Sequence, residues 1–198
     1  MNYTLPKSVY VGGAEYAIRS DFRAALDICA ALNDADLDDQ ERAITVLSIF
    51  YPSSEDMSEK ELAEAAGKRF FEEMPQEDYK EAIEKCFWFL RCGEEERSKG
   101  QPQLVSWEQD FNIICPPVNR IIGKDIRGMD YLHFWSFRSA YMEIGDCFFA
   151  QVVAIRSKKA SGKQLDKQDR AFYRKNRDII DIKVKYTEAE QNLLKEWM

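Results

Sequence analysis

Few residues in this chain have the types and spacing that catalysis requires. His133 is the only histidine, so any Ser-His-Asp or Cys-His arrangement would have to use it. It stands among aromatic residues, in Tyr131-Leu132-His133-Phe134-Trp135, and we interpret it as a hydrogen-bonded structural imidazole. Carboxylate pairs such as Glu108 and Asp110 are common in an acidic chain, and we interpret them as helix caps and solvated faces. We therefore predict no catalytic residues and no enzyme activity.

The arrangement of cysteines and glycines also argues against a metal or a cofactor. Zinc sites use four Cys, His or carboxylate ligands, usually in close pairs. The five cysteines are scattered, and the closest pair, Cys86 and Cys92, has no histidine near it. Ala160-Ser161-Gly162-Lys163 lacks the first glycine and the preceding strand of a phosphate-binding loop, and residues 33–39 lack the glycine of an EF-hand calcium loop. We expect neither a metal nor a cofactor.

The composition suits one globular domain, or a domain with an appendage. Of the 198 residues, 45% are hydrophobic and 13% aromatic, which is ample for a sizeable core. No apolar run approaches the ~18 residues that a membrane span needs. The first residues also lack the basic region and apolar segment of a secretory signal. Cysteines without a C-x-x-C pattern favour a reducing compartment, so we expect a cytosolic protein with no membrane partner.

Charge is unevenly distributed along the chain. The net charge is −7 at pH 7, yet residues 156–177 carry nine Lys or Arg against Asp166 and Asp169, a local charge of +7. Residues 178–198 contribute −2, which leaves −12 for residues 1–155. We interpret the basic segment first as solvated charge facing the acidic body and second as a docking surface for an acidic partner. Nucleic acid is the least favoured partner, because its binders usually present a basic face on a basic domain.

Hydrophobic periodicity and capping signals predict a mainly α fold, a multi-helix bundle that follows a short N-terminal β-hairpin. Gly12-Gly13, between two β-prone runs, predicts the tight hairpin turn. Pro116-Pro117 is expected to bend or interrupt one helix. Helices are predicted over residues 21–32, 40–51, 59–74, 77–91, 107–122, 130–144, 147–158, 165–177 and 187–197.

A polar stretch at residues 94–103, which holds Gly100 and Pro102, predicts a linker between two halves. The first half, residues 1–93, contains the hairpin and the early helices. The second half, residues 104–198, contains the aromatic-rich helices and the basic segment. One compact domain that includes both halves is the alternative.

The predicted helix at residues 130–144 has a wide apolar face. At ~100° per residue its apolar side chains cover well over half the circumference, whereas a surface helix buries a stripe only a little over ~100° wide. The helix is therefore central to the fold, or part of its face awaits a partner. The candidate partner-binding residues combine aromatic side chains, for which core packing is the alternative, with bases of the basic segment: Trp107, Tyr131, Phe134, Trp135, Phe137, Arg170, Arg174 and Lys175.

Five landmarks, in order, resemble the bacteriophage family named after gene product fifteen, small proteins of phages and prophages of Gram-positive bacteria. The resemblance extends from about residue 5 to residue 187, and this chain has Pro116-Pro117 where the family tends to have a single proline. The landmarks are Asp21-Phe22-Arg23, residues 81–90 before Cys92-Gly93, Trp107-Glu108-Gln109-Asp110, Tyr131-Leu132-His133-Phe134-Trp135 with Phe137, and Phe172-Tyr173-Arg174-Lys175-Asn176.

The resemblance implies a role in phage tail assembly. Such proteins are typically encoded near the tape-measure protein, in the place where tail-assembly chaperones sit. It implies a non-enzymatic chaperone or adaptor in the cytoplasm of the bacterial host, with the tape-measure protein or another tail protein as its partner. Two alternatives stay open. One is a structural tail or connector component that self-associates through the hairpin edge or the basic segment. The other, less favoured, is a nucleic-acid-associated factor acting through residues 156–177.

Overall fold

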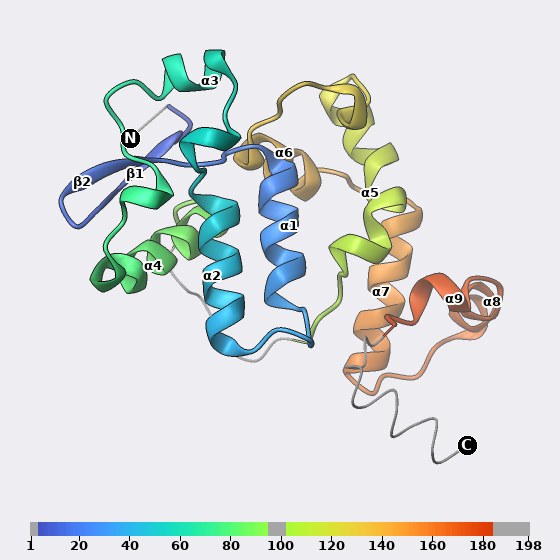
Figure 1. The fold of residues 1–198 in the computed structure, drawn as a ribbon. Coiled ribbons are helices and arrows are strands. Elements are labelled where there is room, and N and C mark those ends of the chain that lie inside the picture. Colours follow the sequence, from blue (N-terminus) through green and yellow to red (C-terminus); the bar gives the residue numbers. More distant parts are fainter. Residues whose placement is uncertain (1–3, 95–101, 184–198) are drawn as a thin grey trace. The chain divides into compact units, whose positions relative to one another are not determined.

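The computed structural model describes residues 4–94 and 102–183 (Figure 1). The predicted mainly α fold with an N-terminal hairpin is confirmed. The elements are β1 (Ser8–Val11), β2 (Ala14–Ala17), α1 (Phe22–Leu32), α2 (Asp39–Phe50), α3 (Glu59–Glu64), α4 (Tyr79–Leu90), α5 (Trp107–Ile122), α6 (Phe134–Met142), α7 (Phe148–Ala160), α8 (Lys167–Lys175) and α9 (Arg177–Ile180). Short 3₁₀ turns lie at Ser54–Asp56, Phe71–Glu73, Gln76–Asp78 and Ile126–Gly128.

The chain forms two compact units. Among the described residues, unit 1 contains residues 4–94 together with His133–Trp135, and unit 2 contains residues 102–132 and 136–183. Helix α6 therefore begins in unit 1 and continues in unit 2. The predicted halves at 1–93 and 104–198 stay a prediction, because most of the predicted linker, residues 95–101, lies outside the described residues.

The hairpin of unit 1 forms at the predicted turn. β1 and β2 pair antiparallel, with Val11 opposite Ala14, and both Gly12 and Gly13 have positive φ angles of 56° and 77°, as a tight two-residue turn requires. On the other edge of β2, the backbone of Arg69 donates to the Glu15 carbonyl at 2.8 Å and accepts from the Ala17 amide at 3.0 Å. The hairpin is thereby held to the rest of unit 1.

The helices of unit 1 follow their capping signals closely, with one exception. Asp21 caps α1, and Asp38 forms a capping box with Glu41 at the start of α2. Ser58 and Glu61 form a capping box at the start of α3. The helix predicted over residues 59–74 is too long, because α3 ends at Glu64. Gly67 lies in the left-handed region at φ 82°, a usual helix terminator, and the next residues turn to pair with β2.

In unit 2, Pro116-Pro117 does not interrupt its helix, and interruption was one of the two predicted effects. Helix α5 extends from Trp107 through both prolines to Ile122 and ends at Gly123, whose φ is 78°. The fixed φ of proline, about −65°, fits a helix, so the cost of each ring is a lost hydrogen bond and local crowding. The aromatic helix α6 is shorter than the predicted 130–144. The helix predicted at 165–177 is shortened to α8, and the short helix α9 follows it from Arg177 to Ile180. The helix predicted at 187–197 lies outside the described residues.

Candidate interaction surface on helix α8

The aromatic candidates pack mostly inside their own units. Phe134 is 3% exposed and Phe137 is fully buried, so neither has a surface to offer a partner, and the core alternative holds for both. Trp135 is half-buried in unit 1, where its indole Nε1–H donates to the Phe89 carbonyl at 2.9 Å. In unit 2, the half-buried ring of Trp107 lies 6.0 Å from that of Phe137. Tyr131, at 43%, is the exposed member of the aromatic set.

His133 is the structural imidazole that its sequence context predicted. It is 3% exposed, and its Nδ1 accepts from the Trp135 amide at 3.0 Å at the start of α6. Because that contact needs an acceptor, Nε2 carries the proton and donates to the Pro6 carbonyl at 2.9 Å. Burial lowers the pKa of His133 below its ordinary value, an effect that the hydrogen bond to Pro6 opposes. The neutral ring thus ties the first residues of the chain to α6 within unit 1.

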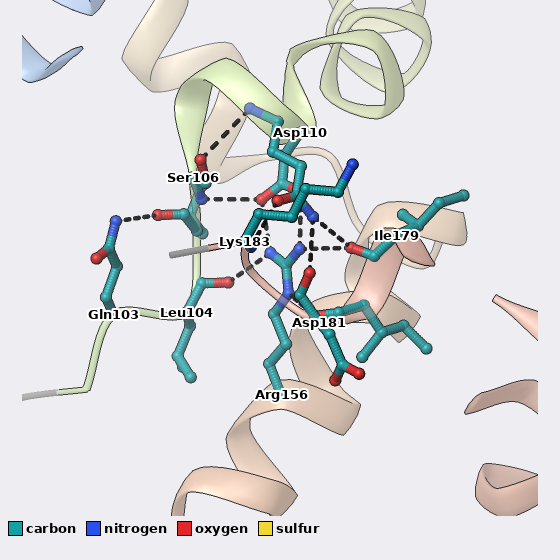
Figure 2. Close-up of polar contacts among 11 residues, drawn as sticks. Gln103, Leu104, Ser106, Asp110, Arg156, Ile179, Asp181 and Lys183 are labelled. Atoms are coloured by element: carbon teal, nitrogen blue, oxygen red, sulfur yellow. Dashed lines mark hydrogen bonds and ion pairs between the residues drawn. The ribbon is translucent and has the colours of Figure 1, made fainter. Parts of the chain in front are cut away.

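A buried ion pair joins α5 to α7 in unit 2 (Figure 2). Arg156 is 5% exposed and Asp110 is fully buried, and the two meet in a bidentate contact with N–O distances of 2.6 Å and 2.9 Å. The remaining guanidinium N–H groups donate to the carbonyls of Leu104, Ile179 and Ile180 at 2.7–2.9 Å. All five N–H groups of Arg156 are therefore satisfied, as a buried guanidinium requires.

Gln109 extends the same network toward the end of the described chain. Its side-chain amide donates to the carbonyls of Ile179 and Asp181 at 3.0 Å and 3.1 Å, and its carbonyl accepts from the Lys183 amide at 3.0 Å. Figure 2 shows Arg156 and this segment converging on the first turn of α5. Residues 179–183 are thus held against α5 by side-chain contacts to backbone atoms.

Sequence reasoning missed this network. The interpretation of Asp110 as a helix cap or solvated carboxylate is wrong about its exposure, although it does accept from the Ser106 amide at 2.9 Å. Arg156, counted in the basic segment, is neutralised and buried. Helical spacing was the available signal, because Arg156 lies four residues after Val152 and seven after Phe149, on the buried stripe of α7.

The rest of the basic segment is partly neutralised. Lys158 pairs with Asp169 at 2.6 Å, and Asp181 pairs with Lys159 at 2.5 Å and with Arg177 at 3.3 Å. The other five bases of the segment have no ion-pair partner within residues 4–94 and 102–183, and all are exposed: Lys163, Lys167, Arg170, Arg174 and Lys175. Three of these are the basic residues predicted to bind a partner.

Helix α8 separates an apolar side from a basic one. Phe172 and Tyr173 pack against the buried cluster of Val152, Ile155 and Ile180. Away from that cluster, the helix presents what we call the basic face of α8: Lys167, Arg170, Arg174 and Lys175. The first three are spaced i, i+3 and i+7, so they project from one side of the helix. The structure therefore brings Arg170, Arg174 and Lys175 together on one exposed surface.

The capping of α8 fits this charge pattern. Asp166 caps the helix by accepting from the Asp169 amide at 2.8 Å, and Asp169 accepts in return from the Asp166 amide at 3.2 Å. Arg174 and Lys175 lie in the last turn, where cations interact favourably with the helix dipole. Both ends of this short helix are thus stabilised by charge while the basic face stays exposed.

The model of the bacteriophage Gp15 protein family matches residues 1–182. The chain belongs to the bacteriophage Gp15 protein family. The resemblance read from the five landmarks is confirmed, and the protein is a phage protein. No curated protein and no solved structure matches the chain.

The matched residues of this Gp15 family member include both α8 and the Asp110–Arg156 pair. No helix in the described part of the chain has the length and apolar character of a membrane-spanning segment. Nor do three His, Cys, Asp or Glu side chains of the described residues gather as metal ligands would. Burial raises the pKa of the Cys86 thiol to about 12, so that thiol is protonated and weakly nucleophilic at neutral pH.

Proposed function

We propose that this Gp15 family protein is a non-enzymatic tail-assembly chaperone or adaptor that binds the tape-measure protein of its phage in the cytoplasm of the host. The observation that carries the proposal is the basic face of α8, four exposed bases with no ion-pair partner among the described residues, on a chain with a net charge of −7. The gene neighbourhood implied by the resemblance, beside the tape-measure protein, supports this choice of partner.

The physical basis is reversible masking. A long tape-measure helix exposes apolar and charged faces until tail-tube subunits cover it, and a helical protein can cover such faces by packing alongside. Exposed, unpaired bases favour acidic segments and increase the rate of encounter with them. The acidic remainder of the chain keeps the complex soluble.

Co-expression with the tape-measure protein of the same phage genome tests this function. We expect the tape-measure protein to become soluble and to co-purify with the tagged full chain. Replacing three bases of the basic face together (Arg170→Glu, Arg174→Glu, Lys175→Glu) should abolish co-purification. The matched control makes the same charge change at exposed lysines elsewhere, Lys60→Glu, Lys80→Glu and Lys124→Glu. If the wild-type chain forms no complex, the proposed function is wrong.

The charge distribution favours a second candidate, a structural tail or connector component. Residues 1–155 carry −12 and residues 156–177 carry +7, so the basic face of one copy could dock on the acidic part of another. Mass spectrometry of purified particles distinguishes the two functions. A chaperone is absent from the finished virion, whereas a structural component is present at a fixed copy number.

A further inference from the structure

Unit 2 has a mostly apolar surface groove between α5 and the start of α7, helices that pack side by side (Figure 1). We call it the α5–α7 groove. Its volume is about 280 Å³, and it is lined by Asn112, Ile113, Pro116, Pro117, Arg120, Cys147 and Phe148. Small-molecule sites usually measure about 300–1,000 Å³ and enclose most of the ligand. An open groove below that range fits a large apolar side chain of a partner better than a metabolite.

The two prolines alter the backbone at the wall of the groove. Neither Pro116 nor Pro117 has an N–H, so the carbonyls of Asn112 and Ile113 lack their i+4 donors. Asn112 and Ile113 themselves line the groove. Pro116 is exposed, so its ring contributes apolar surface there, while the rigid backbone around it loses little entropy on binding.

Phe148 forms the opposite wall and connects the groove to α8. It is 39% exposed, and its ring centroid lies 5.5 Å from that of Phe172 on α8. Lys175 follows Phe172 by three residues and therefore lies at the edge of the basic face nearest to Phe172. The apolar groove thus adjoins one end of the basic face of α8.

Among the described residues that line the groove, Arg120 carries the charge. Its guanidinium is held by the Ile144 carbonyl at 2.9 Å, and Lys175 lies beyond Phe172. Asp146, next to Cys147, is an acidic residue at the start of α7. A partner with acidic side chains flanking an apolar anchor matches this pattern, since the anchor fills the groove while the acids approach Arg120 and the basic face.

We propose that the α5–α7 groove receives the apolar anchor of an acidic amphipathic helix of the tape-measure protein, whose acidic side chains pair with Arg120 and the basic face of α8. The inference rests on the proposed function and adds the chemistry of the bound segment. Helix-in-groove recognition of this kind uses a few apolar anchors at helical spacing, with charges that set orientation.

Pro116→Ala is the most informative variant, because it separates binding from stability. Alanine restores the N–H that the Asn112 carbonyl lacks, so the melting temperature should rise. The same change removes two ring methylenes from the groove, and we expect an approximately tenfold loss of affinity. Ile121→Ala is the matched control, because Ile121 is also exposed, lies on α5 and is outside the groove.

The binding experiment uses the purified full chain and overlapping fragments of the tape-measure protein of the same phage, titrated by calorimetry. We expect the tightest fragment to be acidic and amphipathic, and its affinity to fall with Pro116→Ala and with Lys175→Glu but not with Ile121→Ala or Lys124→Glu. If a fragment binds the wild-type chain and Pro116→Ala equally well, the groove proposal is wrong while the proposed function stands. If no fragment binds, both are wrong.

Binding to a 30-base-pair duplex DNA tests whether the basic face binds nucleic acid instead of an acidic protein segment. Binding of DNA that weakens steeply with salt, is lost with Lys175→Glu and is unchanged by Pro116→Ala would assign the basic face to nucleic acid and overturn the proposal. Absence of DNA binding at the salt concentration where a fragment binds supports it.

Discussion

Arg156 illustrates how a buried charge is tolerated in unit 2. Its five N–H groups all meet acceptors, and two of these belong to Asp110, which also accepts from the Ser106 amide. Desolvating two charges costs several kcal/mol per ion, so such a pair contributes little net stability compared with apolar residues. Its consequence is geometric, because the contacts of Arg156 fix where residues 179–180 lie against α5 and α7.

Removing one partner of this pair should be costly. Arg156→Met leaves Asp110 buried without its counter-charge, so we expect the free energy of unfolding to fall by about 3–5 kcal/mol, measured by urea denaturation. The double variant Asp110→Leu, Arg156→Met should recover much of the loss. Arg127→Met, which removes an exposed arginine paired with Asp125 in the same unit, should change little. Equal losses in the two single variants would contradict a special role for the buried pair.

His133 makes the stability of unit 1 depend on pH near neutrality. Its pKa is lower in the folded chain than its ordinary value of 6.5, so the unfolded chain binds the proton at a higher pH. The stability is therefore complete above about pH 6.5 and is lost as pH falls through that value toward the lowered pKa. Protonation would also place an N–H at Nδ1, facing the amide of Trp135.

Melting temperatures at pH 7.5 and pH 5.5 measure this effect. The wild-type chain should melt lower at pH 5.5, and His133→Asn should reduce the difference, because its side-chain oxygen can still accept from the Trp135 amide but does not titrate. Burial raises the pKa of Asp27, so this group makes the folded chain more stable as the pH falls. The contribution is the same in the wild type and in His133→Asn, and it therefore cancels when the two are compared. The same pH difference in both would assign the dependence to other groups.

At the scale of the element, α8 depends on contacts at its ends and on one apolar side. It has nine residues, too few to be stable alone in water. The capping box of Asp166 and Asp169 and the packing of Phe172 and Tyr173 hold it in place. The orientation of the basic face therefore depends on residues that do not belong to it.

Asp166→Ala should fray α8, so that the side chains of the basic face are no longer held on one side of a helix. The loss of the cap costs about 1 kcal/mol, and we expect faster amide hydrogen exchange in residues 167–175 together with weaker binding of the tape-measure protein. Asp166→Ser retains a capping oxygen and should exchange and bind nearly as the wild type does. Unchanged exchange in Asp166→Ala would show that the apolar side alone orders the helix.

At the scale of the whole molecule, unit 1 is discontinuous in sequence. His133–Trp135 belongs to it and contacts residues far away in the chain. The Phe134 amide donates to the Ser20 carbonyl at 2.8 Å, and the ring of Phe89 lies 5.7 Å from that of Phe134. The first part of the chain therefore lacks three of the residues that complete its core.

A fragment of residues 1–94 should consequently be less stable than the same residues in the full chain. Losing buried aromatic side chains costs about 3–5 kcal/mol each, so we expect a broad thermal transition by circular dichroism. A peptide of residues 129–144 should sharpen the transition and raise its midpoint. The same peptide carrying Phe134→Ala and Trp135→Ala serves as the control and should have no effect. A fragment that unfolds cooperatively without the peptide would contradict this account.

Interactions between residues close in the sequence were sufficient to predict several elements. Gly12-Gly13 gave the hairpin turn because few other residues adopt two positive φ angles in succession. The starts of α1 and α3 were predicted correctly, because the capping contacts of Asp21 and Ser58 join residues within one helical turn. The five landmarks were sufficient to recognise the family. These signals share one property, that the interacting groups are near neighbours along the chain.

Only the tertiary structure decided which polar and aromatic residues are buried. Arg156 and Asp110 are 46 residues apart, and nothing local distinguishes them from solvated charges. Whether Phe137 could bind a partner depended on whether another element covers it. The length of α3 also depended on a distant segment, since Arg69 pairs with β2 instead of continuing the helix. Capping and turn geometry are local and so are encoded within a few residues, whereas burial depends on which distant segments pack together.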